Sequence, residues 1–131
     1  MGQSSMSQKC VFCAPEIDDH ILLEHGSMFL LEDAFPVSPG HSLVIPRRHV
    51  ADYFALYAEE KEDADHLLRL ARQRILERDA TVKGFNVGVN CGVVAGQTIF
   101  HVHIHLIPRR EGDTPNPRGG VRGVIPARMN Y

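Results

Sequence analysis

Three histidines at strict two-residue spacing are the most reactive pattern in the sequence, and an aliphatic residue follows each of them. Alternation of this kind in a run rich in branched residues predicts a β-strand, in which every second residue points to the same face. We therefore expect His101, His103 and His105 on one face and the aliphatic side chains in the core. A plain solvent-facing strand is the simpler interpretation. Imidazole, however, serves as nucleophile, acid, base or metal ligand near neutral pH, so we interpret the face as a reactive site.

A C-x-x-C pair, Cys10 and Cys13, is the second such pattern, and Cys91 stands alone. The pair is half of a tetrahedral zinc site. A redox pair and two incidental thiols are the alternatives, although the strand and helix that surround a thioredoxin-type motif are not evident here. Three cysteines indicate a reducing, cytoplasmic compartment rather than a disulfide framework. The other zinc ligands stay open among the remaining histidines: His20, His25, His41, His49, His66 and the triple-histidine strand.

The elements that must position these residues follow from periodicity. Short strands are predicted at 21–24, 28–31, 41–46 and 84–90, and a further short strand at 121–125. A helix is predicted over 59–78 because Ala64, Leu67, Leu68, Ala71 and Ile75 form one apolar stripe. Residues 51–56 are expected to form a helical turn. On the 84–90 strand, Phe85, Val87 and Val89 should face the core, and a hairpin after it would bring Asn90 beside the histidines.

Size and composition limit the function classes. The chain has 131 residues, 44% hydrophobic residues and a net charge of −2, which fits one soluble globular domain. The charge gives no basic footprint for sequence-independent nucleic-acid binding. No apolar run approaches the roughly 20 residues of a membrane span, and no secretory signal is recognised. Residues 1–9 are expected to be a flexible N-terminus.

The H-V-H-I-H-L-I run at 101–107 resembles the motif of the histidine triad (HIT) family. Two further stretches support the resemblance. Asp33 with Pro39-Gly40-His41 through Pro46 is similar to the family's ribose and base region, and Asn90 with Ala95-Gly96-Gln97-Thr98 is similar to its phosphate-binding loop. The similarity covers residues 10–110, leaving 111–131 as a C-terminal tail expected to pack on the domain or on a dimer partner.

The resemblance implies roles for individual residues. His103 would be the nucleophile that attacks the α-phosphorus of a nucleoside 5′-phosphate derivative, giving a nucleotidyl-imidazole that water resolves. His105 and His41 would assist by hydrogen bonding to the phosphate, and Asp33 would bind the ribose hydroxyls. The phosphate oxygens or the leaving group would be held by Asn90, Gln97 and Thr98. No catalytic metal is required, because positioning and charge stabilisation carry such transfers.

The resemblance also implies a metal site and a fold. Some bacterial relatives bind zinc through a C-x-x-C pair, a downstream histidine and the first histidine of the triad, which here gives Cys10, Cys13, His49 and His101. This zinc would be structural. The implied fold is α+β: a five-stranded antiparallel sheet with two helices, whose sheets merge in a two-fold homodimer.

Several activities within the family stay open. Hydrolysis of dinucleoside polyphosphates such as diadenosine tetraphosphate is weakly favoured by residues 95–98 and 108–113. Asp33, in contrast, resembles the residue of the phosphoramidase branch at this position. The nucleotidyltransferase branch is disfavoured by His105 and by the short chain. A nucleotide sensor without turnover is the alternative from another class. Arg118 and Arg122 are equally consistent with solvated charges and with phosphate contacts.

Overall fold

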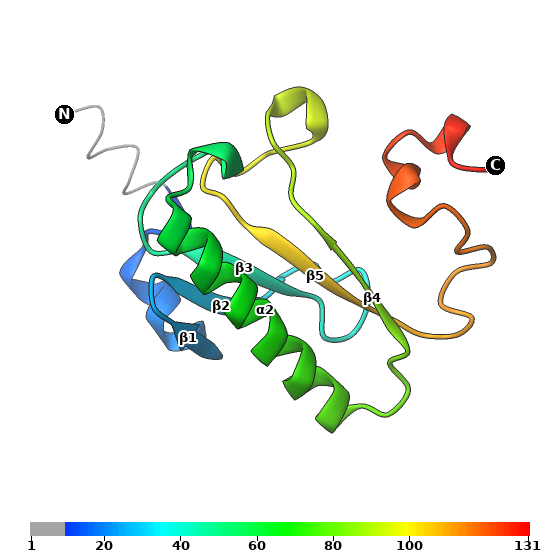
Figure 1. The fold of residues 1–131 in the computed structure, drawn as a ribbon, viewed down its shortest axis with the longest axis horizontal. Helices are drawn as coiled ribbons and strands as arrows, with labels where there is room; N and C mark the ends of the chain where they lie inside the picture. Colours follow the sequence, from blue (N-terminus) through cyan, green and yellow to red (C-terminus); the bar gives the residue numbers. More distant parts are fainter. Residues whose placement is uncertain (1–9) are drawn as a thin grey trace.

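The computed structural model describes residues 10–131, so the predicted flexible segment 1–9 lies outside the described residues. One antiparallel sheet forms the body of the molecule, with the strand order β1-β2-β3-β5-β4 (Figure 1). The strands are β1 (Leu23–His25), β2 (Met28–Glu32), β3 (Ser42–Pro46), β4 (Gly84–Gly88) and β5 (Ile104–Arg109). The α+β class with a five-stranded antiparallel sheet is therefore confirmed.

Helix α2 (Ala58–Arg78) covers one face of the sheet and begins one residue before the predicted start. Its buried stripe includes Ala64, Leu67, Ala71 and Ile75, as the periodicity indicated. Glu60 is buried as well, because its carboxylate accepts hydrogen bonds from the Tyr57 N–H (2.8 Å) and the Arg48 guanidinium (2.7 Å). The second longest helical segment is the 3-10 helix η1 (Pro15–His20).

Alternation along the strands divides the core between the two faces of the sheet. Leu30, Val44 and Leu106 pack under α2, and the odd-numbered Leu31 and Leu43 pack on the opposite face. The even positions of β5 therefore face α2 and its odd positions face the other side. This parity places His105 on the face of the sheet that points away from α2.

The triple-histidine strand is shorter than predicted. β5 begins at Ile104, so His101 and His103 precede it in a segment whose Val102 N–H donates to the carbonyl oxygen of Val50 (2.8 Å). Val102, Ile104 and Leu106 are buried, as expected. The pattern therefore predicted the burial of the aliphatic side chains correctly and the length of the strand incorrectly. Residues 101–103 do not pair with β3, because the Val102 N–H bonds the loop at Val50 instead.

Strand β4 is more exposed than predicted. Phe85 and Val89 pack against the core, but Val87 is 49% exposed. Val87 pairs with Leu106 on the α2 face, yet β4 forms the edge of the sheet, and α2 packs over β1, β2, β3 and β5. Edge strands bury less of their inward face.

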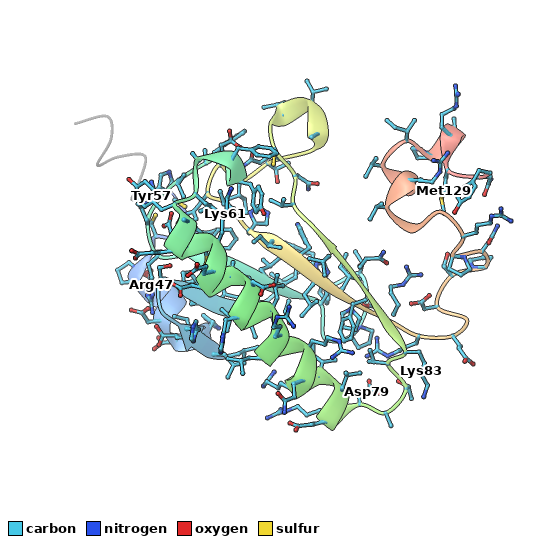
Figure 2. The ribbon with its side chains drawn as sticks, viewed as in Figure 1. Arg47, Tyr57, Lys61, Asp79, Lys83 and Met129 are labelled. Carbon is cyan, nitrogen blue, oxygen red and sulfur yellow. The ribbon has the colours of Figure 1, made fainter. Side chains whose placement is uncertain are left out.

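The C-terminal segment after β5 lies beside the β4 edge of the sheet, where Figure 2 labels Met129. It contains the 3-10 helices η4 (Gly120–Val124) and η5 (Pro126–Arg128), so the strand predicted at 121–125 is wrong. Glycine-rich sequence at 119–123 favours tight turns over a strand. The Arg122 guanidinium donates to the carbonyl oxygens of Arg128 (3.0 Å) and Met129 (3.1 Å). Arg118 and Arg122 each lie 4.7 Å from the ring centre of Tyr131.

The remaining helical turns are η2 (Tyr53–Ala55), inside the turn predicted at 51–56, and η3 (Val93–Ala95) in the loop after β4. None of the helices within residues 10–131 combines the length and apolar character that a membrane crossing needs.

Candidate active site

Two cysteine sulfurs and two imidazole rings, all possible metal ligands, meet where the N-terminal segment approaches residues 101–105. The donor atoms of Cys10, Cys13, His49 and His101 all lie within 4.8 Å of one another. Cys13 Sγ lies 3.1 Å from His49 Nδ1 and 3.5 Å from His101 Nδ1, and Cys10 Sγ lies 3.5 Å from the same His101 atom. Tetrahedral zinc with bonds of about 2.0–2.3 Å separates its ligand atoms by roughly 3.3–3.8 Å, so the spacing fits this metal.

The protonation states in this cluster also suit zinc. His101 is fully buried, and its Nε2–H donates to the carbonyl oxygen of Pro46 (2.7 Å), which leaves the Nδ1 lone pair facing the two sulfurs. Burial, reinforced by the neighbouring Cys10, raises the pKa of the Cys13 thiol to about 11. A bound zinc ion would offset the free-energy cost of ionising this thiol, since zinc binds cysteine as the thiolate. Cys10, Cys13, His49 and His101 would hold the ion and tie the N-terminal segment to the histidine run. His20, His25, His41 and His66 lie outside the cluster.

His103 is held in one tautomer by its own chain. Its Nδ1–H donates to the carbonyl oxygen of His101 (2.9 Å), because a carbonyl oxygen can only accept. The ring contacts Phe12 at 5.3 Å and His105 at 5.2 Å between centroids. The remaining nitrogen, Nε2, therefore carries the lone pair of the neutral ring, and no hydrogen bond to it is formed within residues 10–131.

His41 and His105 form a hydrogen-bonded pair. The Val37 N–H donates to Nδ1 of His41 (3.1 Å), so neutral His41 carries its proton on Nε2 and donates it to Nδ1 of His105 (2.9 Å). His105 consequently carries its own proton on Nε2, as an outward donor. Burial lowers the pKa of His41, which is 3% exposed, and Asp33 opposes this effect. Burial is also the largest cause that lowers the pKa of His105, followed by His103 and His41.

A cavity of about 680 Å³ adjoins this pair. Its lining includes His41, His105 and Asn90, further residues of β4 and β5, and Val121 and Val124 of the C-terminal segment. The volume is that of a site for a small-molecule ligand. Asn90, two residues after β4, therefore lines the same cavity as His41 and His105.

The predicted substrate-binding residues lie in different surroundings. Asp33 Oδ2 is 3.4 Å from His41 Nε2, and its Oδ1 accepts the Phe35 N–H (2.8 Å). Gln97 is buried with all its hydrogen bonds to main-chain groups, namely the Gly92 N–H (2.9 Å) and the carbonyl oxygens of Ala51 (2.8 Å) and Ile99 (3.1 Å). Thr98 is exposed in the same loop. Contacts of Asn90, Gln97 and Thr98 with phosphate stay predictions.

Sequence reasoning missed three groups at the site. Phe12, between the two cysteines, is 8% exposed and packs against both His101 and His103. An aromatic residue inside a C-x-x-C pair is a signal that could have been noticed. The Val37 N–H and the Pro46 carbonyl oxygen are main-chain groups, and no side-chain pattern identifies them.

The comparisons with known proteins agree with this geometry. Residues 14–112 match the model of the HIT domain. An uncharacterised HIT-like protein of Mycoplasma genitalium is 32% identical over 114 residues, covering 83% of this chain and 79% of the relative. A bis(5′-nucleosyl)-tetraphosphatase (asymmetrical) of Schizosaccharomyces pombe is 41% identical over 78 residues, which cover 60% of this chain and 42% of that protein. An adenylylsulfatase of Arabidopsis thaliana is 36% identical over 119 residues (84% and 57%).

Solved structures give the same assignment. A zinc-bound histidine triad family protein of Mycobacterium smegmatis superposes with a TM-score of 0.72 at 30% identity, covering 92% of this chain and 94% of that one. A hypothetical histidine triad nucleotide-binding protein of Sulfolobus tokodaii gives a TM-score of 0.71 at 32% identity (82% and 73%). With the triad, the fold and the family model in agreement, the chain belongs to the HIT domain family.

Proposed function

We propose that the chain is a nucleotide hydrolase that cleaves nucleoside 5′-phosphate derivatives at the α-phosphorus through a covalent nucleotidyl-His103 intermediate. The observation that carries the proposal is the free Nε2 of His103, which the hydrogen bond from Nδ1–H to the His101 carbonyl oxygen turns away from the main chain. A neutral imidazole with an unengaged lone pair is a competent nucleophile at pH 7.

In this mechanism Nε2 of His103 attacks phosphorus and the leaving group departs. The Nε2–H of His105 donates to a phosphate oxygen, with His41 holding the ring in the required tautomer. Donors fixed before the reaction stabilise the charge that develops on the phosphoryl group. Asn90 and Thr98 would complete the phosphate contacts, and Gln97 would hold their loop through its hydrogen bonds to main-chain groups. Asp33 would accept hydrogen bonds from the ribose hydroxyls. Water then attacks the nucleotidyl-imidazole and releases the nucleotide.

The substrate class is an AMP-containing purine nucleotide. Dinucleoside polyphosphates are weakly favoured by residues 95–98 and 108–113, and a tetraphosphatase is among the relatives. The second candidate is cleavage of an adenylyl compound with a smaller leaving group, a phosphoramidate or a phosphosulfate. An adenylylsulfatase relative that aligns over 84% of this chain favours it. A nucleotide sensor without turnover would bind AMP without forming an adduct.

The decisive experiment replaces His103 with Asn. Wild-type chain, quenched without acid during turnover of diadenosine tetraphosphate, adenosine 5′-phosphosulfate or adenosine 5′-phosphoramidate, should carry one added adenylyl group in intact-protein mass spectrometry. His103→Asn should lose the adduct and at least about a thousandfold in kcat/KM, yet still bind AMP. His66→Asn, on the exposed side of α2, is the control. Wild-type turnover retained by His103→Asn would refute the mechanism, and binding without an adduct would favour the sensor.

We also propose that zinc occupies the Cys10, Cys13, His49 and His101 cluster as a structural ion. The donor spacing and the zinc-bound relative support this. Thiol ligands of this kind persist in a reducing compartment, which supports a cytoplasmic location.

A homodimer in which two sheets join along β4 is the assembly we propose. β4 is an edge strand with a half-exposed Val87, and such edges favour pairing with another chain. Light scattering on the chromatographed protein should give twice the chain mass, and Val87→Lys should give one chain mass. A wild-type chain that elutes as a monomer would exclude this assembly.

A further inference from the structure

One carboxylate oxygen lies beside both nitrogens of the His41–His105 hydrogen bond. Asp33 Oδ2 is 3.4 Å from His41 Nε2 and 3.9 Å from His105 Nδ1, and these nitrogens are 2.9 Å apart. The other oxygen of Asp33 accepts the Phe35 N–H, which fixes the orientation of the carboxylate. A carboxylate that only bound ribose would have no need to approach both imidazoles.

Counting protons shows what this oxygen can do. In the neutral pair one proton lies between the rings and one sits on His105 Nε2, and the Val37 N–H occupies Nδ1 of His41. A further proton can therefore enter only at Nδ1 of His105, where it breaks the N–H···N bond. Both ring N–H groups then face Asp33 Oδ2, which can accept from each.

A metal ion is a poorer occupant of the same position. The donor atoms of Asp33, His41 and His105 lie close enough to hold one. The Val37 N–H, however, takes the lone pair of His41 Nδ1, so Nε2 carries a hydrogen towards the other two groups and offers no lone pair. The arrangement suits a proton.

We infer that Asp33 is a positioning residue that holds His105 as an imidazolium, which protonates the leaving group and later accepts a proton from the attacking water. The inference rests on the proposed function and deepens it. A carboxylate plays the corresponding role towards the histidine of serine-protease triads, where it stays ionised and stabilises the imidazolium.

The proton balance closes over the two steps. The lone pair of His103 Nε2 forms the bond to phosphorus, and the electron pair of the broken bond leaves with the departing atom. That atom takes the Nε2 proton of His105, which becomes neutral and keeps Nδ1–H towards Asp33. Water then attacks phosphorus, His105 Nε2 accepts one water proton, and the electron pair of the P–N bond returns to His103.

The charges around His105 give the sign of the effect. Burial lowers its pKa most, His103 and His41 lower it further, and Asp33 raises it. At the rim of the cavity Arg109 and Asp113 pair with each other at 2.8 Å. Removing the Asp33 charge should therefore deprotonate His105 at lower pH, and the alkaline limb of the activity profile should move towards acid by about one to three pH units.

The test compares two substrates with the same nucleoside in wild type and Asp33→Asn. Ammonia leaving from adenosine 5′-phosphoramidate needs a proton, whereas p-nitrophenolate leaving from adenosine 5′-(p-nitrophenyl phosphate) does not. Asp33→Asn should lower kcat for the phosphoramidate by about tenfold or more at pH 7.5, move its alkaline limb towards acid, and change kcat for the nitrophenyl ester much less. Asn keeps an acceptor for the Phe35 N–H, so the loop should stay folded.

Glu32→Gln is the matched control, because it removes the same charge one residue earlier at an exposed position on the α2 side of the sheet. It should leave both substrates and the pH limb unchanged. Equal losses on the two substrates with Asp33→Asn, or a higher KM with an unmoved limb, would overturn the inference and leave ribose binding. A wild type inactive on both substrates would instead refute the proposed function.

Nitrogen-15 spectra of the histidine rings give a measurement that does not depend on turnover. In a pH titration of the metal-loaded protein without nucleotide, the His105 ring should lose its second proton at lower pH in Asp33→Asn than in wild type. Coinciding titration curves would overturn the inference even if the kinetics changed.

Discussion

Two histidine clusters draw on the same short run of the chain, at His101 and at His105, yet their imidazoles present opposite chemistry, a lone pair in one cluster and an N–H in the other. At His101 the Pro46 carbonyl oxygen holds a proton on Nε2 and turns the Nδ1 lone pair towards two sulfurs. In the other cluster the Val37 N–H donates to Nδ1 of His41, and His41 Nε2–H donates to Nδ1 of His105. His105 therefore presents its Nε2–H as a donor. His103 lies between the clusters and presents a lone pair on Nε2.

The difference shows that main-chain partners select the function of each imidazole. A carbonyl oxygen fixes which nitrogen keeps the proton, and an amide fixes which nitrogen loses it. One residue type therefore supplies a metal ligand, a nucleophile and a proton donor. Substitutions in one cluster should leave the chemistry of the other largely intact, which makes the comparison testable.

The largest effect should come from breaking the metal cluster. Cys13→Ser removes the sulfur that lies closest to His49 and close to His101. Zinc content in chelator-free protein should fall from about one per chain to near zero, and the free energy of unfolding should drop by about 3 kcal/mol or more, since structural zinc sites contribute up to about 10–16 kcal/mol in small domains. Elemental analysis and urea unfolding measure the two quantities.

Cys91→Ser is the matched control, since Cys91 is a half-buried free thiol outside the cluster. It should retain zinc and most of the stability. Zinc retained in Cys13→Ser, or wild-type stability unaffected by a chelator, would disprove a structural ion at this cluster.

Much of this arrangement was predictable from the sequence because it depends on parity and spacing. Alternation at 101–106 correctly predicted that the aliphatic side chains are buried. The apolar stripe predicted α2 to within one residue at its start. The Cys10, Cys13, His49 and His101 group implied by the family resemblance is brought together in the structure. Each of these features is recorded in residue types along the chain.

The remaining features depend on contacts that residue types do not specify. The Val37 N–H and the Pro46 carbonyl oxygen determine the tautomers, and any residue could supply such groups. Val87 is exposed because β4 forms the sheet edge, and the strand pattern does not reveal strand order. The turns at 120–124 replace the predicted strand because consecutive glycines at 119 and 120 adopt positive φ.

A smaller effect should appear in the pH dependence of the free energy of unfolding, to which His41 contributes. Burial lowers the pKa of His41 in the fold, so the unfolded chain binds the proton first as pH falls below about 6.5. The contribution of His41 to stability is complete above that pH and is lost below it, with a slope of up to about 1.4 kcal/mol per pH unit. Wild-type unfolding free energy should therefore fall between pH 6.5 and 5.5.

Replacing His41 with Asn should make that fall smaller by about 1 kcal/mol, because the fold then no longer has to keep a buried imidazole neutral at position 41. Acid also releases metal from the other cluster, but this loss is common to both proteins and cancels in the difference. Equal slopes in wild type and His41→Asn would mean that His41 itself takes up a proton in the fold without cost, contrary to the hydrogen bond that His41 Nδ1 accepts from the Val37 N–H.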